Sequence, residues 1–254
     1  MIAGEFKPKL SVITVVYNNV NAIERTMKSV VNQMYDNLEY IIIDGASSDG
    51  TLDIVKKYET HIARIISEKD GGIYDAMNKG LQIATGDYVL FMNSGDEIYA
   101  SDTVEKVFAT DANADIYYGE TEMFNDKWQS LGQRRHKAPE TFTWKSFKRG
   151  MNISHQAIYI KRNITEPYDL KYSLSADIDW IIKAAKRANR IVNVNIYVAK
   201  YLVGGMSKAK HSQSLKERFN IFSKHYGLIP NLINHFVIAI NLGIYFLKHR
   251  KTND

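Results

Sequence analysis

Small and acidic residues directly follow an apolar run in the first half of the chain. The run from Tyr88 to Met92 has the pattern of a strand buried on both faces, and it ends in Asn-Ser-Gly-Asp over residues 93–96. Packing alone does not favour such residues at the end of a buried strand. Because open α/β sheets bind ligands beyond the carboxyl ends of their strands, Asp96 is placed to hold a charged or hydroxylated ligand.

Three further polar sites lie at the ends of predicted elements. Strands predicted over 10–16 and 40–43 are followed by Tyr17-Asn18 and by Asp44. Asp177 lies at the start of a predicted helix, where the helix dipole favours an acidic residue even without a function. These positions predict a ligand site built from side chains at one edge of a sheet.

The elements that position these residues follow from apolar periodicity. Strands are predicted over 10–16, 40–43, 62–67, 86–92, 115–118, 157–160 and 191–202, and helices over 23–33, 51–58, 73–84, 102–108 and 175–187. Asn21 and Glu24 form a predicted capping box for the first helix, and Ser101 or Asp102 is expected to cap the fourth. Residues 119–150 are irregular, with a hairpin expected around Asn125-Asp126.

Strands that alternate with helices predict an α/β protein with a parallel sheet and right-handed crossovers. The first strand is followed by Tyr17-Asn18-Asn19, so a dinucleotide-binding Gly-x-Gly-x-x-Gly loop is absent. A phosphate-binding Gly-x-x-x-x-Gly-Lys-Ser/Thr loop is absent as well. Ligand binding at the strand ends must therefore depend on side chains.

The composition is that of an ordinary globular protein. The 254 residues are 45% hydrophobic and 24% charged, with no cysteine for a disulfide framework or a thiolate metal site. Residues 1–7 lack the apolar core of a secretory signal, so a cytoplasmic location is expected. The net charge of +5 comes without a basic helix interleaved with stacking aromatics, which argues against a nucleic-acid partner. A solvated basic face or one that meets anionic lipid fits better.

A helix predicted over 228–247 is apolar enough to raise the question of a membrane span. Its polar residues fall mostly along one stripe, and Lys248-His249-Arg250-Lys251 follow. That pattern suits a helix lying on the inner face of a membrane, and packing on the main domain or a homodimer partner is the equal alternative. We expect a catalytic domain over 1–210, with a donor-binding half at 8–118 and an acceptor-binding half at 119–210, and a helical region over 211–254.

Five segments in order resemble the family 2 inverting nucleotide-sugar glycosyltransferases. They are 12–18 (Val-Ile-Thr-Val-Val-Tyr-Asn), 43–51 (Ile-Asp-Gly-Ala-Ser-Ser-Asp-Gly-Thr), 70–80 (Asp-Gly-Gly-Ile-Tyr-Asp-Ala-Met-Asn-Lys-Gly), the stretch 86–97, and Ala176-Asp177. The resemblance covers roughly residues 10–207 and is closest to members from bacterial capsule and exopolysaccharide assembly. It implies the A-type glycosyltransferase fold, a Rossmann-like, mostly parallel central sheet flanked by helices, here with a C-terminal helical extension.

The resemblance implies a nucleotide-sugar donor, expected to be UDP-linked, at the ends of the first strands. Asp44 would accept from a base imide N–H, and Gly71-Gly72 would bring backbone N–H groups to the ligand at a helix start. The remaining implied donor contacts are Thr14, Val16, Tyr17, Asn18, Asp70, Asn78, Asn93 and Ser94. For the polar ones among these, a role as a cap or turn residue is the structural alternative.

The family's acidic motif implies a Mg²⁺ or Mn²⁺ ion that neutralises the diphosphate leaving group. This chain has Asn-Ser-Gly-Asp over 93–96 where many relatives have Asp-x-Asp-Asp, so Asp96 is the expected metal ligand. His211 is a second candidate as a metal ligand or phosphate contact, and a lone surface histidine is the alternative.

Asp177 matches the family's catalytic base, although Ala176 replaces the glutamate that commonly precedes it. His155 and Gln156 are expected on the acceptor side, with His155 a competing base. The Gln-x-x-Arg-Trp motif of processive members is absent, which implies addition of one sugar to a saccharide or lipid-linked saccharide acceptor. A non-catalytic nucleotide-sugar or glycan-binding subunit is the alternative function, whereas a nucleotidyltransferase would want a Gly-rich basic loop after the first strand.

Overall fold

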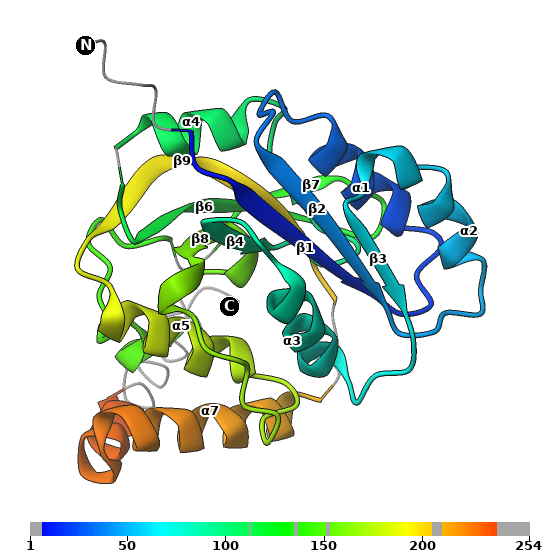
Figure 1. Ribbon diagram of the computed structural model, residues 1–254. Coiled ribbons are helices and arrows are strands. Elements are labelled where there is room, and N and C mark those ends of the chain that lie inside the picture. Colours follow the sequence, from blue (N-terminus) through cyan, green and yellow to red (C-terminus); the bar gives the residue numbers. More distant parts are fainter. Residues whose placement is uncertain (1–6, 112, 135–136, 151–152, 205–209, 238–254) are drawn as a thin grey trace, which may run out of the picture.

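A computed structural model describes residues 7–111, 113–134, 137–150, 153–204 and 210–237. The described residues form a nine-stranded sheet with the order β3-β2-β1-β4-β8-β6-β9-β5, with β7 paired to β6. Helices cover both faces of this sheet (Figure 1). The predicted α/β class with a central sheet and C-terminal helices is confirmed.

The first half of the sheet is parallel, as its apolar runs predict. It contains β1 (Leu10–Val16), β2 (Leu38–Asp44), β3 (Arg64–Ser67) and β4 (Tyr88–Phe91). Val16 is in register with Asp44, and Asp44 with Ser67, so the carboxyl ends of three strands meet at one edge. The polar residues that follow them are thereby gathered in space.

The second half of the sheet mixes directions. It contains β6 (Ile116–Phe124), β7 (Ser130–Gln133), β8 (Ile158–Lys161) and β9 (Ile191–Leu202). The β8 strand pairs antiparallel with β4 and β6, while β6 and β9 are parallel. A two-residue strand, β5 (Glu97–Ile98), pairs with β9 and was too short to be predicted from periodicity. It brings the residues after β4 beside β9.

Alternate residues of each strand face two separate hydrophobic layers. In β1, Val12 faces one layer and Ile13 the other. The first layer lies under α1 (Ile23–Val31), α2 (Thr51–Lys56) and α4 (Thr103–Ala109). The second lies under α3 (Ile73–Ile83), α5 (Ala176–Arg187) and α7 (His211–Tyr226). Short 3-10 turns span Glu59–His61, Ser146–Arg149, His155–Ala157 and Arg162–Ile164.

The predicted helix caps are wrong in detail. The helix α1 begins after Ala22 without a side-chain cap, because the Glu24 carboxylate accepts from the Tyr58 hydroxyl at 2.9 Å instead. Asp102 does precede α4, but its carboxylate pairs with Lys106 at 2.7 Å and makes no capping hydrogen bond. In both cases a nearby partner takes the side chain that would have capped the helix.

The predicted hairpin around Asn125-Asp126 is confirmed as the turn between β6 and β7. Asn125 Oδ1 accepts from the Gln129 N–H at 2.9 Å, which closes the turn. Trp128 in this turn stacks on Phe124, and the Arg25 guanidinium lies 4.0 Å from the centre of the Trp128 ring. The hairpin is thus held against α1.

The helix α7 is fixed to α5 by a buried carboxylate. Asp179 lies 2.7 Å from His225 Nε2, 3.1 Å from Lys224 Nζ and 2.9 Å from Lys183 Nζ. Burial alone would raise the pKa of Asp179, but these partners outweigh it and hold the pKa well below its ordinary value. Only 1% of the Asp179 side chain is exposed, so these ion pairs are buried between the two helices.

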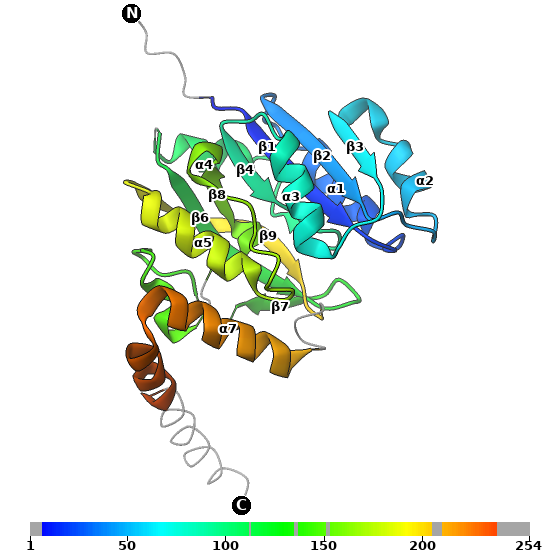
Figure 2. The same cartoon turned by 60° about the horizontal axis from the view of Figure 1, so that its bottom comes forward.

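Residues 228–237 are helical and turn away from the sheet beyond α7 (Figure 2). The predicted helix over 228–247 can be compared only up to residue 237, because the remainder lies outside the described residues. Within the described part of the chain, no helix has the length and apolarity that crossing a bilayer requires.

Candidate active site

A cavity of about 760 Å³ lies where the two halves of the sheet meet. Among its lining residues are six that the sequence singled out: Asn93, Ser94, Asp96, His155, Gln156 and Asp177. They come from the turn after β4, the 3-10 turn before β8, and the start of α5. The structure thus gathers the expected catalytic and acceptor-side residues around one space.

The turn after β4 is shaped by its neighbours in α1. The Thr26 hydroxyl accepts from the Gly95 N–H at 2.9 Å and donates to the Asp96 carbonyl at 2.7 Å. Gly95 has φ 107°, a left-handed conformation that a side chain would strain. Asn19 Nδ2 donates to the Ser94 hydroxyl at 2.9 Å. The turn is therefore held in one shape by the end of β1 and by α1.

Asp96 is buried between two segments from the second half of the chain. Its Oδ2 accepts from Gln156 Nε2 at 2.6 Å, and its Oδ1 accepts from the Leu202 N–H at 3.0 Å. Burial raises the pKa of Asp96 to about 6, against the lowering effect of both hydrogen bonds and of His155. Gln156, expected on the acceptor side, thus holds the carboxylate after β4.

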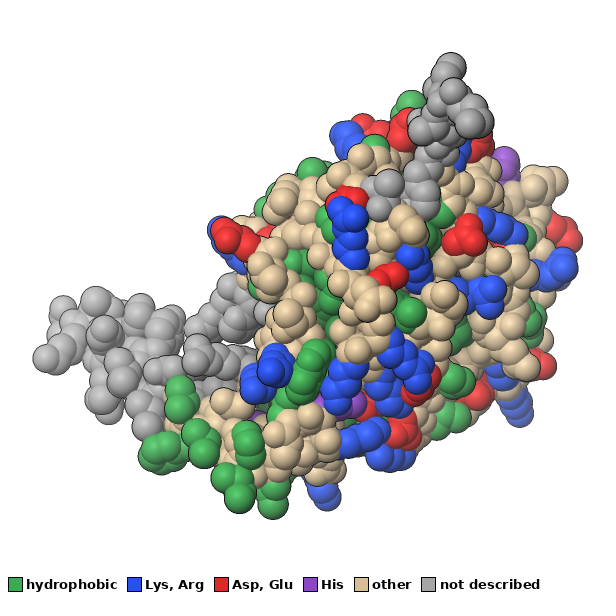
Figure 3. Space-filling view, turned by 60° about the vertical axis from the view of Figure 1, so that its left-hand side comes forward, with side chains coloured by type: hydrophobic (Ala, Val, Ile, Leu, Met, Phe, Trp, Pro, Cys, Tyr) green, Lys and Arg blue, Asp and Glu red, His purple; other side chains and the backbone are tan. Residues whose placement is uncertain are grey.

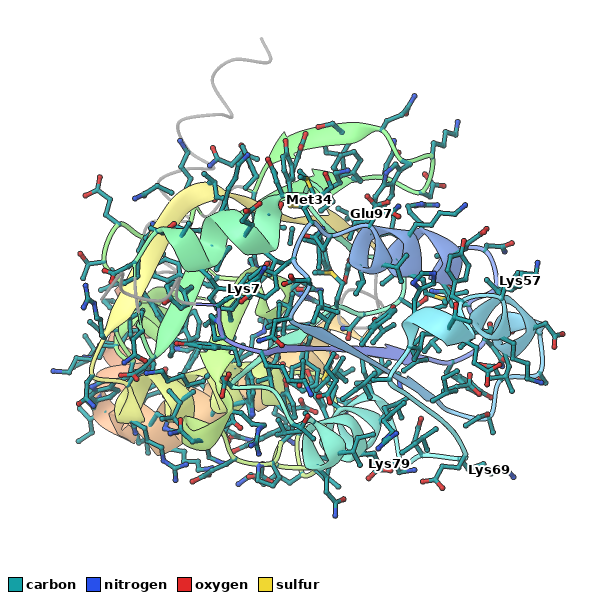
Figure 4. The ribbon with its side chains drawn as sticks, turned by 45° about the horizontal axis from the view of Figure 1, so that its top comes forward. Lys7, Met34, Lys57, Lys69, Lys79 and Glu97 are labelled. Atoms are coloured by element: carbon teal, nitrogen blue, oxygen red, sulfur yellow. The ribbon has the colours of Figure 1, made fainter. Side chains whose placement is uncertain are left out.

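Glu97, the second carboxylate after β4, does not face this cavity. It lies next to α1 (Figure 4), 3.1 Å from Lys200 Nζ and 3.7 Å from Arg25 Nε. The two neighbouring carboxylates therefore have different partners. Glu97 ties β5 to β9, and Asp96 alone contributes a carboxylate from this turn to the cavity.

His155 links the turn after β4 to the start of α5. Asn93 Nδ2 lies 2.9 Å from His155 Nε2, and His155 Nδ1 lies 3.4 Å from Asp177 Oδ2. An amide N–H directed at Nε2 places the imidazole proton on Nδ1, where it faces the carboxylate. In this tautomer both ring nitrogens of His155 have a partner, and the Nδ1–H is directed at Asp177.

The Asp177 carboxylate interacts with several side chains around the cavity. The Tyr74 hydroxyl donates to its Oδ1 at 3.1 Å. Burial alone would raise the pKa of Asp177, but His155, Tyr74 and the nearby Arg218 hold it below the ordinary value. Asp177 is therefore ionised at neutral pH and able to accept a proton.

Aromatic stacking orients Tyr74 toward Asp177. The Tyr74 ring stacks on Tyr168 at 5.3 Å, and Tyr168 stacks on Trp180 at 5.0 Å. Asn78, expected to bind the donor, instead exchanges two hydrogen bonds with the Tyr168 backbone, at 3.0 and 2.7 Å. The amide of Asn78 thus holds the loop of Tyr168, whose ring stacks on Tyr74.

The start of α5 is positioned from α7, which the sequence alone did not indicate. The Glu217 carboxylate accepts from the Ser173 and Leu174 N–H groups at 3.1 and 2.9 Å. The Ser175 hydroxyl lies 3.1 Å from that of Ser214. These contacts join residues about forty positions apart in the sequence, and no local pattern could have found them.

The edge formed by the ends of β1 and β2 is a second polar site. Asp44 is fully buried, and its Oδ2 accepts from the Ser47 N–H at 3.0 Å and the Ser67 hydroxyl at 2.6 Å. Its Oδ1 is buried without a hydrogen-bond partner among the described residues. A buried carboxylate oxygen left free in this way calls for a donor from a ligand.

Tyr17, Asn18 and Asp70 surround the same edge. Tyr17 is exposed, and a side chain at Gly45 would lie 3.2 Å from its ring and 2.6 Å from Asp70 Oδ2. Asn18 adopts φ 45° and accepts from the Ser48 N–H at 2.9 Å, which fixes the loop after β2. Because Gly45 has no side chain, the space between the Tyr17 ring and the Asp70 carboxylate stays open.

Other predicted donor contacts have structural roles. Thr14 is fully buried, 3.1 Å from the Tyr40 hydroxyl and bonded to the Met92 carbonyl, and Val16 packs in the first hydrophobic layer. Both side chains point into the layer under α1. At the start of α3, the Gly71 and Gly72 N–H groups are taken by Asp75 and Asp70, each at 2.9 Å.

Lys79 on α3 points outward. Its Nζ donates to the carbonyl of Lys69 at 2.9 Å and pairs with Glu68 at 2.8 Å, and Figure 4 shows Lys79 and Lys69 close together at the surface. These contacts fasten the loop of Asp70 to α3. The loop is thereby fixed beside the β2 edge.

His211 does not reach the cavity. It is the first residue of α7, is exposed, and is not among the lining residues. The described residues contain no group of three His, Cys, Asp or Glu side chains suited to a metal ion. Asn93 Oδ1 is buried without a partner beside Asp96 in the described part of the cavity. One carboxylate and one amide oxygen suit a Mg²⁺-like ion that takes its other ligands from a diphosphate and water.

Residues 11–166 match the family model described as "Glycosyl transferase family 2". The chain belongs to this family. A PGL/p-HBAD biosynthesis glycosyltransferase of Mycobacterium bovis is 30% identical over 213 residues, which is 79% of this chain and 79% of the relative. The resemblance found in the sequence motifs is confirmed at the level of the family.

Solved structures share the fold of this chain. S. aureus TarS 1-349 in complex with UDP-GlcNAc has a TM-score of 0.65 and 20% identity, covering 90% of this chain and 73% of that one. The mannosyltransferase PcManGT from Pyrobaculum calidifontis, in complex with GDP-Man and Mn²⁺, has a TM-score of 0.58 and 17% identity, covering 92% and 76%. The family 2 chain described here therefore has the A-type glycosyltransferase fold.

Proposed function

We propose that this family 2 glycosyltransferase moves one sugar, with inversion, from a UDP-sugar to a saccharide or lipid-linked saccharide acceptor in bacterial surface polysaccharide synthesis. The observation that carries the proposal is the ionised Asp177 in the cavity, held by His155 and Tyr74. Such a carboxylate can take the proton of an acceptor hydroxyl. The family relative named for PGL/p-HBAD biosynthesis is consistent with a surface glycan product.

In this mechanism the two halves of the chain act on opposite sides of the sugar. The acceptor oxygen attacks the anomeric carbon while its proton passes to the Asp177 carboxylate. The bond between that carbon and the diphosphate oxygen breaks, and the nucleoside diphosphate leaves. His155 and Tyr74 keep the carboxylate oriented throughout, because each is itself held by Asn93 or by the stack on Tyr168.

The donor nucleoside is assigned to the β1–β2 edge. The free Oδ1 of Asp44 would accept the imide N–H of uracil, and the exposed ring of Tyr17 lies beside it for stacking on the base. The UDP complexes of TarS support the choice of uracil. We accordingly assign residues 8–118 to donor binding and 119–210 to acceptor binding, with Asp96 at the junction.

A divalent cation would be held by Asp96 together with Asn93 Oδ1. When bound, it would supply positive charge to the diphosphate as the glycosidic bond breaks. The Mn²⁺ complex of PcManGT supports this assignment. Ser94 is oriented by Asn19 at the same place and would contact the diphosphate directly or through water.

The enzyme is proposed to act in the cytoplasm at the membrane surface. Large hydrophobic side chains are exposed on one stretch of helix, namely Leu228, Ile229, Leu232, Ile233 and Phe236. Figure 3 shows hydrophobic side chains gathered at the lower left, with Lys and Arg side chains beside them. An apolar stripe flanked by basic groups suits an anionic lipid surface, where a lipid-linked acceptor would be presented.

Release of UDP from UDP-sugars, measured with Mn²⁺ and with a panel of glycan acceptors, tests the proposed reaction. We expect Asp177→Asn to lower turnover by about 10²- to 10⁴-fold, because the base is lost, with donor affinity little changed. Asp53→Asn on the exposed face of α2 is the matched control. Undiminished turnover in Asp177→Asn would exclude the base, and no turnover by the wild-type protein with any donor would favour a binding subunit.

A further inference from the structure

Two arginines line the cavity without a carboxylate partner. Arg134 follows β7, and Arg218 lies on α7. Arg134 Nη1 donates to the Ser154 hydroxyl at 2.9 Å, which leaves its other N–H groups uncommitted among the described residues. Arg218 Nε is buried and has no hydrogen-bond partner in the described part of the chain.

Three other described arginines form ion pairs, and Arg64 and Arg162, which do not, are exposed to solvent. Arg187 and Arg190 form ion pairs with Glu166 and Asp111. Arg25 pairs with Glu97. Two half-buried guanidiniums share this cavity with a single nearby carboxylate, Asp177, and the buried Nε of Arg218 has no acceptor among the described residues, so the cavity has room for a ligand that brings negative charge.

The two arginines lie on the side of the cavity that carries the base. Arg218 contributes to holding down the pKa of Asp177, whereas the pKa of Asp96 is affected by burial, Leu202, Gln156 and His155 and by neither arginine. Burial lowers the pKa of Arg134, and Asp177 acts to raise it. The contacts agree: Ser154, the partner of Arg134, directly precedes His155, which lies 3.4 Å from Asp177, and Arg218 directly follows Glu217, which holds the start of α5.

The position of the base determines which substrate this anion belongs to. In an inverting displacement the base and the leaving diphosphate lie on opposite faces of the sugar. A group bound near Asp177 and away from Asp96 is therefore part of the acceptor. Two forked guanidiniums match the charge and oxygens of a phosphate better than the single charge of a carboxylate.

We propose that Arg134 and Arg218 bind a phosphate group of the acceptor, so that the substrate is a phosphorylated or phosphate-linked glycan and not a neutral one. This inference rests on the proposed function, because it takes Asp177 as the base. The phosphate would be bound by Arg134 from the end of the β6–β7 hairpin and by Arg218 from α7. The acceptor hydroxyl would then be presented to Asp177.

Phosphate binding to the UDP-saturated enzyme tests the proposal, since UDP fills the donor diphosphate site. The probes are inorganic phosphate and phenyl phosphate, followed by titration calorimetry, with benzyl alcohol as the uncharged comparison. We expect both phosphates to bind the wild-type complex, and Arg134→Gln and Arg218→Gln each to weaken that binding by about tenfold or more. Arg190→Gln, far from the cavity in a surface ion pair, is the matched control.

Affinity for UDP separates the two sources of phosphate. We expect it to stay within about twofold of wild type in both variants, since donor contacts are elsewhere. A tenfold loss of UDP affinity would overturn the proposal and assign the arginines to the donor diphosphate. Absence of phosphate binding to the UDP complex, or binding unchanged in both variants with native thermal unfolding, would overturn it too. Failure of the proposed function is distinct, because the wild-type enzyme would then release no UDP from any sugar nucleotide.

Discussion

Asp44 has one carboxylate oxygen that accepts two hydrogen bonds and another that is buried without a partner among the described residues. The second oxygen can only accept, so it favours a base that presents an N–H at that point. Uracil presents its imide N–H, whereas cytosine presents a ring nitrogen that accepts. This single atom therefore distinguishes the two pyrimidines.

We expect Asp44→Asn to lower the preference for UDP over CDP. The oxygen of the new amide would take the bonds from Ser47 and Ser67, and its NH₂ would face the ligand and repel the imide N–H. Loss of a hydrogen bond to a charged group predicts a roughly tenfold or greater loss of UDP affinity. Titration calorimetry with UDP and CDP measures both affinities, and an unchanged ratio of the two would remove Asp44 from the base site.

At the scale of elements, α7 and α5 are joined by one buried carboxylate. Asp179 faces His225, Lys224 and Lys183. Glu217 meets the start of α5 about two turns earlier along α7. Because Asp177 lies in the first turn of α5, the same contacts that fix the helix pair also fix the proposed base.

We expect the stability contributed by Asp179 to depend on pH. Its pKa is depressed in the folded state, so the contribution is full above the ordinary carboxyl pKa of about 4 and is lost as the pH falls through the folded value. Asp179→Asn leaves the lysines without their anion and should cost about 3–5 kcal/mol at pH 7. Urea unfolding of both proteins at pH 7 and below pH 4 measures the difference. The difference in the free energy of unfolding between the two proteins should be smaller in acid. A difference that does not change with pH would contradict this account.

The sequence predicts elements well where one face or both faces are apolar, as in β1, β2 and α3. It misses β5, because two residues carry no periodicity and pair only through β9. Within the candidate site, Asp44, Asp96 and Asp177 are apparent from their places at the ends of elements. The sequence does not reveal the site roles of Arg134, Arg218 and Glu217, because these roles depend on contacts between distant segments. The contact of Asn78 with the Tyr168 backbone was equally hidden, because the two residues are ninety positions apart.

At the scale of the molecule, the exposed apolar stripe of residues 228–237 predicts binding to anionic vesicles. Replacing Ile229, Ile233 and Phe236 by serine should abolish co-sedimentation with phosphatidylglycerol vesicles, because each apolar side chain contributes about 1.5–3 kcal/mol when buried. Leu131→Ser, also an exposed apolar residue, is the control on β7. Binding that survives the triple change would exclude the stripe, and a dimer lost with it in sedimentation velocity would assign the stripe to a second copy.

The closure of the catalytic cavity by β9 and α7 has a consequence for synthesis on the ribosome. Asp96 lacks its Leu202 partner, and Asp177 lacks its support from Glu217, until β9 and α7 have been made, well after β1 to β4. On the proposed function, a nascent chain would therefore complete the edge for the nucleoside before it completes the site of sugar transfer.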